Sequence, residues 1–595
     1  MMVRPALLIA LTLCASAHAT RRMETLIKNR AFAPGGRFTN TNTDPLFAFL
    51  PATAQVTGCS DDATYTGTKG EALTFTRAST ATCQAADGAV VPMATGKPRV
   101  EGGTIVTPAG PWNLVIGNNF AAWGGGGITL AQGDASCNPA PDGTNTAWLA
   151  TPTTTNSSLA LTTATATGQQ TTFGVWIRRA NGAGATTLGI YNEPAAGVDI
   201  TPTTTWTQYS STTSASTSLV RIGGYSSYSN AADGAVCLWR AQMNWGGALG
   251  LYADTTAIAS PKRAPAVVTG ARLRSETTST NSSLNSAAID LWGASGTGTV
   301  TANTAVAPDG TLSADTYATT NNTSIMFNAA TVPSNTAFVH SVWMSSVSGT
   351  ANPSVGMTCA PASCTCATSD GSACSTGTFG STLCYATATV GTTPVRVEAR
   401  VVCNAAQTSI NRWVAGGVYG VSTGTARFWG SQLEAGATAA SSYIPTAGTA
   451  TVRAPDAASV TGSWALGTTP CIGATVRLDR AGAQQASAGA SNSASNFFAQ
   501  GRNPTAGKLR TEYQPGSQIA DSAGSVTTGV TYRWVSRADG TNFNSCVDGA
   551  CTATAATVGG TSTFGAIGIG SVLGLNQLNG LVGDVKVSNT ATGCN

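Results

Sequence analysis

Side chains that could carry catalytic chemistry are few in this chain. It has two histidines in 595 residues, His18 and His340. His18 lies in an apolar N-terminal stretch, and no serine and aspartate can be assigned to His340 as a catalytic triad. Glycosidases need two carboxylates on either side of the sugar bond, whereas Glu512 stands alone on its predicted strand. No glycine-rich phosphate loop opens a helix. We therefore expect a protein without catalytic residues.

Aromatic side chains are better candidates, for binding rather than catalysis. Sugars bound to β-sandwiches stack on aromatic faces and form hydrogen bonds with amides and carboxylates. The alternative for each aromatic residue is packing inside a sandwich core. We assign Trp239 and Trp429 to a core, because each stands beside an apolar residue in two similar segments. The candidate ligand-binding residues are Trp176, Trp206, Tyr225, Tyr228, Trp343, Trp413 and Tyr419.

Three carboxylates could join backbone carbonyls in a structural calcium site, which is the one cofactor that the sequence suggests. They are Asp142, Asp309 and Glu434. The first two belong to Asp-Gly pairs, so the alternative is an ordinary solvated turn.

Cysteine usage favours disulfides. Fourteen cysteines remain when Cys14 of the N-terminal stretch is set aside, an even number. The cluster at residues 359–374 lacks the paired spacing of a zinc site. Six cysteines between residues 359 and 403 leave fifteen connectivities open. The pairs that we expect are Cys59–Cys83, Cys137–Cys237, Cys471–Cys594 and Cys546–Cys551.

The N-terminus, "MMVRPALLIALTLCASAHAT", has one arginine, an apolar run and a small-x-small site. These features predict a secretory signal peptide over residues 1–19, the alternative being a buried first strand. No later stretch is apolar enough to anchor the chain in a membrane. The net charge of +4 comes without a basic cluster, which argues against nucleic acid as a partner. We expect a soluble protein that is secreted or held at the cell surface.

The elements that must position these residues are β-strands. Charged residues make up only 10% of the chain. Threonine, valine and aromatic residues recur in short runs separated by Asp-Gly, Asn-Gly and proline turns, which is the pattern of an all-β protein. In "TTFGVWIRRA", Phe173, Val175 and Ile177 share one face of a strand, and Trp176 and Arg178 share the other.

A repeat organises these strands. "APDG" at residues 140–143 recurs at 307–310, and "FGVW" at 173–176 aligns with "HSVW" at 340–343, both at an offset of 167 residues. The closing motif "LWRAQM" at 238–243 aligns with "FWGSQL" at 428–433 at an offset of 190. The second copy therefore holds about 23 extra residues, which we place in a cysteine-rich loop at 357–384. The alignment predicts that Trp176 superposes on Trp343, and Trp239 on Trp429.

Two longer segments resemble a known family. "LTFTRASTATCQAADGAVV" at 73–91 and "ARFWGSQLEAGATAASSYIPTAGTATVRAPDAASV" at 426–460 resemble phage tail-fibre and head-fibre proteins, as does "PRVEGG" at 98–103 in weaker form. This resemblance implies jelly-roll modules similar to carbohydrate-binding modules, in a non-catalytic and often trimeric protein that contacts cell surfaces. The export signal and the cysteines depart from virion proteins, which assemble in the cytosol.

The C-terminal part resembles a laminin-G or concanavalin-A-like sandwich. "TYRWVSRADGTNFNSCVDGACT" at 531–552 reads as two strands, each followed by an Asp-Gly turn. The predicted fold is thus a pair of tandem jelly-roll β-sandwiches followed by a concanavalin-A-like sandwich. The predicted segments are a signal peptide at 1–19, an N-terminal fibre-like region at 20–110, module 1 at 111–247, a linker at 248–277, module 2 at 278–447 and the C-terminal domain at 461–595.

Two classes of function follow from these patterns. The first is a non-catalytic adhesin or fibre that binds surface glycans, as a homo-oligomer and by the resemblance a trimer. The second is a structural spacer or virion decoration protein without a ligand. A glycan depolymerase is a third hypothesis, but the sequence offers no set of catalytic residues for it.

Overall fold

The computed structural model describes residues 47–49, 56–60, 71–107, 112–115, 120–154, 157–162, 169–181, 183, 187–193, 197–214, 219–223, 234–249, 252, 262–263, 267–269, 271–331, 337–360, 364–368, 383–403, 409–437, 439–479, 485–493, 496–503, 507–514, 518–555, 562–571, 578–590 and 594. The predicted signal peptide, Tyr225 and Tyr228 lie outside the described residues.

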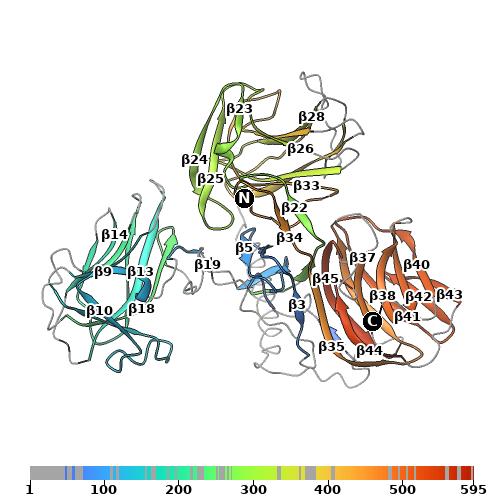
Figure 1. Ribbon diagram of the computed structural model, residues 1–595, viewed down its shortest axis with the longest axis horizontal. Coiled ribbons are helices and arrows are strands. Elements are labelled where there is room, and N and C mark those ends of the chain that lie inside the picture. Colours follow the sequence, from blue (N-terminus) through green and yellow to red (C-terminus); the bar gives the residue numbers. More distant parts are fainter. Residues whose placement is uncertain are drawn as a thin grey trace, which may run out of the picture.

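The chain is all-β and forms three β-sandwiches (Figure 1). Its described helices are two single turns of 3-10 type, η1 (Phe120–Ala122) and η2 (Ile289–Leu291). No helix among the described residues is long and apolar enough to cross a membrane. Module 1 lies to the left in Figure 1, module 2 at the top and the C-terminal sandwich to the right. Short strands of the N-terminal region lie between them.

Module 1 consists of two five-stranded antiparallel sheets. The outer sheet has the order β10 (Ile128–Gln132), β11 (Trp148–Pro152), β18 (Val236–Trp245), β13 (Thr171–Arg179), β16 (Thr207–Thr213). The facing sheet has the order β15 (Val198–Ile200), β14 (Leu188–Glu193), β17 (Leu219–Gly223), β12 (Ser158–Thr162), β9 (Gly124–Gly126).

The alternation predicted for β13 is confirmed. Phe173, Val175 and Ile177 are fully buried in the core between the two sheets. Trp176 points to the opposite face, where it packs beside Trp239. The pleat of a single strand therefore serves both the core and an outer surface.

Module 2 repeats this strand order in two sheets. One has the order β24 (Gly298–Val306), β25 (Leu312–Thr319), β33 (Thr425–Ala435), β27 (Ala337–Ser346), β31 (Val395–Cys403), β29 (Cys364–Thr368). The other has the order β23 (Gly293–Ser295), β26 (Ile325–Thr331), β32 (Ser409–Ala415), β28 (Ser354–Ala360), β30 (Leu383–Thr387).

The predicted insertion differs from a simple loop. Its first residues, 357–360, complete β28, and residues 364–368 form β29, which pairs with β31 at the edge of the sheet. Residues 361–363 and 369–382 lie outside the described residues. The extra chain therefore adds a strand to module 2 that has no counterpart in module 1.

The repeat extends to single hydrogen bonds. Asn113 in β8 (Trp112–Asn113) accepts hydrogen bonds at Oδ1 from the backbone N–H groups of Val115 and Met243, each at 3.1 Å. Asn281 in β22 (Ser279–Asn281) accepts the same pair from Ser283 and Leu433, at 2.9 and 3.0 Å. A buried amide thus fastens the first and last strands of each module.

The C-terminal sandwich takes strands from distant parts of the chain. One sheet has the order β43 (Ala550–Ala555), β42 (Asn542–Val547), β41 (Thr531–Ala538), β36 (Cys471–Leu478), β45 (Gly580–Ser588), β21 (Arg272–Ser275), β6 (Val100–Glu101), and β1 (Phe47–Phe49) also pairs with β45. The other has the order β3 (Thr74–Thr76), β35 (Ala457–Leu466), β44 (Ser562–Ile569), β37 (Gln485–Ser493), β38 (Asn496–Asn503), β39 (Lys508–Gln514), β40 (Gln518–Ser525).

This arrangement departs from the predicted boundaries. Residues 272–275, predicted as linker, form a strand inside this sandwich, and so do parts of the predicted N-terminal region. The two Asp-Gly turns predicted at 531–552 do connect β41, β42 and β43. Short ladders complete the fold: β2 (Val56–Thr57) with β20 (Val267–Thr269) and β7 (Thr104–Thr107), β4 (Ala81–Gln84) with β5 (Val90–Met93), β8 with β19 (Lys262–Arg263), and β22 with β34 (Thr451–Arg453).

A buried cluster of charges joins the N-terminal region, module 2 and the C-terminal sandwich. We call it the arginine hub, and its members are Arg77, Arg99, Glu276, Arg453 and Asp456, each at most 4% exposed. Arg99 Nη1 and Arg453 Nη1 both lie 2.7 Å from Glu276 Oε2, and Arg77 Nη1 lies 3.2 Å from Asp456 Oδ1. Arg99 Nη2 also pairs with Asp456.

Electrostatics show why the hub holds as a unit. Burial alone would lower the pKa of Arg99, but the carboxylates of Asp456 and Glu276 outweigh it and raise this pKa. Burial lowers the pKa of Arg453 in spite of Glu276. Each buried charge therefore depends on its neighbours, because an ion without a partner in this setting is strongly unfavourable. The segments 73–91, 98–103 and 426–460 supply four of the five members, and Glu276 comes from the predicted linker.

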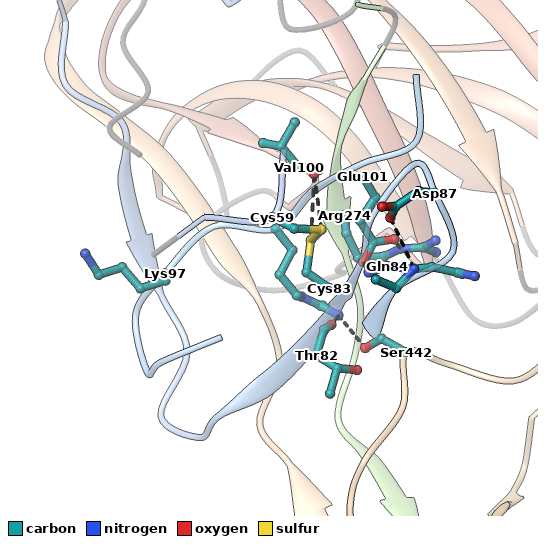
Figure 2. Close-up of a disulfide and its surroundings, with 12 residues drawn as sticks. Cys59, Thr82, Cys83, Gln84, Asp87, Lys97, Val100, Glu101, Arg274 and Ser442 are labelled. Atoms are coloured by element: carbon teal, nitrogen blue, oxygen red, sulfur yellow. Dashed lines mark hydrogen bonds and ion pairs between the residues drawn. A yellow bond between two sulfur atoms is a disulfide. The ribbon is translucent and has the colours of Figure 1, made fainter. Parts of the chain in front are cut away.

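The described residues form four disulfides, which are the four pairs expected from the sequence: Cys59–Cys83, Cys137–Cys237, Cys471–Cys594 and Cys546–Cys551. Figure 2 shows Cys59–Cys83 beside Val100, Glu101 and Arg274, with Ser442 of the module 2 side close by. This disulfide fixes the N-terminal strands next to the hub, where Ser442 donates from its backbone N–H to Glu276 Oε1 at 2.9 Å.

Candidate functional site

Each module carries a tryptophan pair on the outer face of one sheet. In module 1, Trp176 of β13 faces Trp239 of β18, and their rings lie 6.2 Å apart in an edge-to-face arrangement. In module 2, Trp343 of β27 faces Trp429 of β33 in the same arrangement at 5.3 Å. Both pairs sit at a register shift that marks a β-bulge. The predicted correspondence of the four tryptophans therefore agrees with the strand registers.

In module 2 the tryptophan pair is covered by other residues of the module and by the N-terminal region. Tyr443 packs against both rings at 5.4 and 4.6 Å, and Val90 of the N-terminal region joins the same cluster. The guanidinium of Arg396 lies over the Trp343 ring at 4.4 Å. Trp343 and Trp429 are 3% and 2% exposed. Trp343, predicted to bind a ligand, is instead a core residue between module 2 and its neighbours.

In module 1 the corresponding face reaches solvent. Trp176 is half-buried, and its register partner on the neighbouring strand, Gln208, is exposed. Trp206 is also half-buried, and its ring is fixed by a hydrogen bond from Nε1 to the carbonyl oxygen of Pro139 at 3.0 Å. The indole of Trp176 thus lies beside the exposed side-chain amide of Gln208, and β-sandwich proteins use this combination to bind sugar rings.

Two arginines border this face. Arg178 stacks on Trp206 at 5.3 Å, and its two terminal nitrogens donate to Asn181 Oδ1 and the Ser136 carbonyl. Arg240 follows Trp239 in β18, and its guanidinium lies 3.9 Å from the Trp239 ring centroid and 4.7 Å from that of Tyr252. We call the set Trp176, Trp206, Gln208, Trp239 and Arg240 the aromatic platform.

The loop beneath the platform holds Asp142. This carboxylate accepts hydrogen bonds at Oδ1 from the N–H and Oγ1 of Thr144 and pairs with Arg240 Nη2 at 3.1 Å. Partial burial would raise the pKa of Asp142, but the bonds from Thr144, together with Arg240, lower it.

In module 2, Asp309 makes the same two bonds with Thr311, yet burial raises its pKa. The module 2 turn is covered, because Trp245 Nε1 donates to the Gly310 carbonyl at 3.2 Å.

The three carboxylates predicted for calcium are not brought together. Asp142 lies in module 1, Asp309 in a turn of module 2 and Glu434 in β33, where it accepts hydrogen bonds from the N–H and Oγ of Ser441. Within the described ranges, no three His, Cys, Asp or Glu side chains gather in a way that could hold a metal ion. The two aspartates serve as turn residues, which was the alternative weighed above.

The other predicted binding residues of module 2 are core residues. Trp413 is fully buried and donates from Nε1 to Thr358 Oγ1 at 3.2 Å, while Tyr419 is 6% exposed and packs on Trp413 at 4.8 Å. Neither ring offers a face to a sugar. His340 is also fully buried, so it is a packing residue in the interior of module 2 and does not face a site. Of the seven predicted aromatic residues, the structure thus brings Trp176 and Trp206 together on an open face.

Gln208 and Arg240 were not among the predicted site residues. Gln208 carries no sequence signal beyond its place on a short strand. Arg240 does carry one, because "LWRAQM" aligned with "FWGSQL" sets an arginine against a glycine. A glycine inside a strand marks a bulge or a close backbone approach, so an arginine in the same place is unexpected for packing alone.

A concave region lies where the N-terminal region, module 2 and the C-terminal sandwich meet. It has a volume of about 600 Å³, and its lining includes Arg274, Arg477, Glu101 and Asp479. Arg274 pairs with both Glu101 and Asp479, and Arg477 Nε pairs with Asp479 at 2.7 Å. These charges satisfy one another within one sheet of the C-terminal sandwich, to which β6, β21 and β36 belong.

Comparisons with known proteins give the following. No protein-family model and no curated protein matches the chain. Among solved structures, the tandem CBM22 domains of Paenibacillus barcinonensis Xyn10C match with 10% identity over 56% of this chain and 99% of that one, at a TM-score of 0.19. Domains LG4-5 of the mouse laminin alpha1 chain match with 10% identity over 45% and 86%, at a TM-score of 0.18. The LG1-3 region of the laminin alpha2 chain matches with 8% identity over 73% and 95%, at a TM-score of 0.18. Likenesses of this size carry no conclusion about ligand.

Proposed function

We propose that this protein is a non-catalytic glycan-binding protein and that the aromatic platform of module 1 is its binding surface. The observation that carries the proposal is the open Trp176–Gln208 face, whose counterpart in module 2 is covered by Tyr443, Val90 and Arg396. A sugar ring stacked on Trp176 would bury apolar carbon on the indole, while Gln208 exchanges hydrogen bonds with hydroxyls at the ring edge.

The wider role that we propose is an adhesin or fibre at the cell surface. The fibre-like sequence motifs and the predicted signal peptide support it, and the four disulfides are compatible with an extracellular protein. A single shallow platform buries little area and orders flexible hydroxyls, so its affinity for sugar is low. Assembly into a trimer would raise avidity through effective concentration, without any new contact.

Binding of the protein from residue 20 onward to a glycan array tests the proposal. The wild-type chain is expected to bind a defined subset of glycans. Trp176→Ala and Gln208→Ala should each weaken that binding roughly tenfold or more, which corresponds to about 1.4 kcal/mol. Because Gln208 is exposed, its replacement leaves the core intact and separates lost binding from lost folding.

Tyr191→Ala is the matched control. Tyr191 is a half-buried aromatic of the same module, and it lies in β14 of the facing sheet. Its removal should leave glycan binding unchanged. A wild-type protein that binds no glycan on the array would contradict the proposal and favour the structural spacer, and release of new reducing ends from a bound polysaccharide would favour a depolymerase.

A further inference from the structure

Arg240 occupies a backbone conformation that module 2 fills with glycine at the matching position. Its φ is 50°, in the left-handed region, and the residue aligned with it in module 2 is Gly430 with a φ of 69°. Both are the first of two bulge residues that face a single residue of the partner strand. Glycine adopts this conformation without steric strain, and a longer side chain does not. Module 1 therefore keeps an arginine against the backbone preference of its own strand.

Ordinary packing does not account for that arginine. Its ion pair with Asp142 joins two side chains that are 36% and 28% exposed, and such pairs add little to stability. The loop that carries Asp142 is also held by the Cys137–Cys237 disulfide and by a hydrogen bond from Trp239 Nε1 to Thr146 Oγ1 at 3.2 Å. The loop thus has firm attachments that do not involve Arg240.

The surroundings of Arg240 hold its guanidinium in one orientation at the edge of the platform. Trp239 and Tyr252 lie against the group, and Asp142 binds one of its terminal nitrogens. The Trp239 ring in turn lies 6.2 Å from Trp176, the proposed stacking surface. A planar, oriented guanidinium is the side chain best suited to bind a carboxylate through two parallel hydrogen bonds. Backbone strain that brings such a group to an open face is typical of binding sites.

We propose that Arg240 makes the aromatic platform selective for glycans that carry carboxylates, such as uronic or sialic acids. The inference rests on the proposed function of the platform and adds the ligand class. The sugar ring stacks on Trp176, and its carboxylate binds the edge of the guanidinium that Asp142 does not occupy. Arg178, on the other side of the platform, adds a second positive charge next to Trp206.

Paired ligands test this selectivity with the protein from residue 20 onward. The probes are hyaluronan oligosaccharides with their methyl esters, and sialyllactose with its methyl ester, since the members of each pair differ only in the charge of the carboxylate. We expect at least tenfold tighter binding of the charged member of one pair, and a weaker preference as salt is raised. The pair that shows the preference tells uronic acids from sialic acids.

Three variants make the test specific. Arg240→Gly places the module 2 residue in module 1, so the backbone tolerates it. The ratio of the affinities for the charged and the neutral member of the pair should then fall to about one, while the neutral member still binds. Arg240→Lys keeps the charge without the planar fork and should retain part of the preference. Arg221→Gln is the matched control, because it removes a cation paired with Glu193 on the facing sheet. It should leave the preference unchanged.

The outcomes separate this inference from the proposed function. Binding of glycans with no difference between charged and neutral members, or with a preference that Arg240→Gly does not alter, would overturn the role of Arg240 and leave the platform in place. Binding of no glycan by the wild-type chain would overturn the proposed function itself.

Discussion

The two modules share a strand order and differ in the layer at the centre of each sandwich. In module 1, Trp123 packs on Phe173 with ring centroids 6.2 Å apart, in an apolar layer that includes Val220. In module 2, Trp292 packs on His340 at the same 6.2 Å, and the strand registers set Arg412 at the position of Val220. The same frame thus holds an apolar layer in one copy and a polar layer in the other.

The polar layer is costly to module 2. Arg412 is fully buried, and none of its guanidinium nitrogens has a hydrogen-bond partner in the described part of the chain. Burial lowers the pKa of Arg412 to about 10. Module 1 holds Val220 at this position and contacts module 2 through the hydrogen bond from Trp245 to Gly310, whereas module 2 is also fastened through the arginine hub. The outside attachment of module 2 thus accompanies a buried, unpaired guanidinium in its interior, while the outer face of module 1 stays open to solvent.

The largest expected effect comes from breaking the attachment. Asp456→Asn removes a carboxylate that binds both Arg77 and Arg99 and leaves buried cations without their partner. We expect a loss of about 3–5 kcal/mol in the free energy of unfolding of module 2 and the C-terminal sandwich. Hydrogen exchange on peptides from β33 and β36 measures it, and peptides from β13 and β18 of module 1 should keep their protection.

Glu193→Gln is the control for that experiment, because it breaks the half-exposed pair with Arg221 inside module 1. It should change stability by at most about 1 kcal/mol. An effect of Asp456→Asn no larger than that of Glu193→Gln would show that the hub does not fasten module 2.

The second prediction concerns acid. Burial, with the nearby charge of Arg412, lowers the pKa of His340 to about 3. Because the unfolded chain takes up this proton near the ordinary pKa of about 6.5 and the folded chain does not, the stability of module 2 falls as pH drops from about 6.5 toward 3. His340→Phe restores the module 1 residue, so the difference in unfolding free energy between variant and wild type should grow by roughly 1.4 kcal/mol per pH unit below 6.5.

Wild type and His340→Phe must be compared with each other, because Asp315 changes the stability of module 2 with pH in the opposite direction. Burial raises its pKa to about 6, so its protonation favours the folded state as pH falls from about 6 toward 4. This contribution is common to wild type and variant and cancels in the difference. A difference that stays constant between pH 7 and pH 4 would refute the assignment to His340.

The smallest effects are expected at the bulge. In module 2, Gly430→Ala sets a Cβ 2.7 Å from Trp343 and adds left-handed strain, and we expect a loss of about 1–3 kcal/mol. In module 1, Arg240→Gly relieves about 1 kcal/mol of strain and removes a half-exposed ion pair and a stacking contact of similar size. Thermal unfolding should therefore change by less than about 1 kcal/mol. A large loss in Arg240→Gly would make the arginine a structural residue.

Much of the fold could be read from the sequence, since alternation, turn residues and short repeated motifs are local signals. The face assignments of β13 and the β41–β43 turns follow from neighbouring residues. The hub could not be predicted, because Arg77 and Asp456 are separated by 379 positions and no spacing rule joins them. Two residues of the platform, Trp176 and Trp206, were predicted from the sequence. An aromatic residue type fits a sugar-binding face and a core equally well. Whether its ring is accessible depends on whether another part of the chain covers it, as Tyr443 covers Trp343.

The strand order of the C-terminal sandwich affects how the protein folds during translation. β6 lies in the same sheet as β45 and is joined to it through β21, which pairs with both strands. At ordinary rates of translation, the ribosome needs on the order of a minute to pass from residue 101 to residue 588. During that time β6 and later β21 have emerged, but the strand that joins them to the sheet does not yet exist. Module 1, whose two five-stranded sheets come from residues 124–245, can close much earlier. The chain on the ribosome therefore carries a folded module 1 beside unpaired strand edges, which are open to wrong pairing until β45 is made.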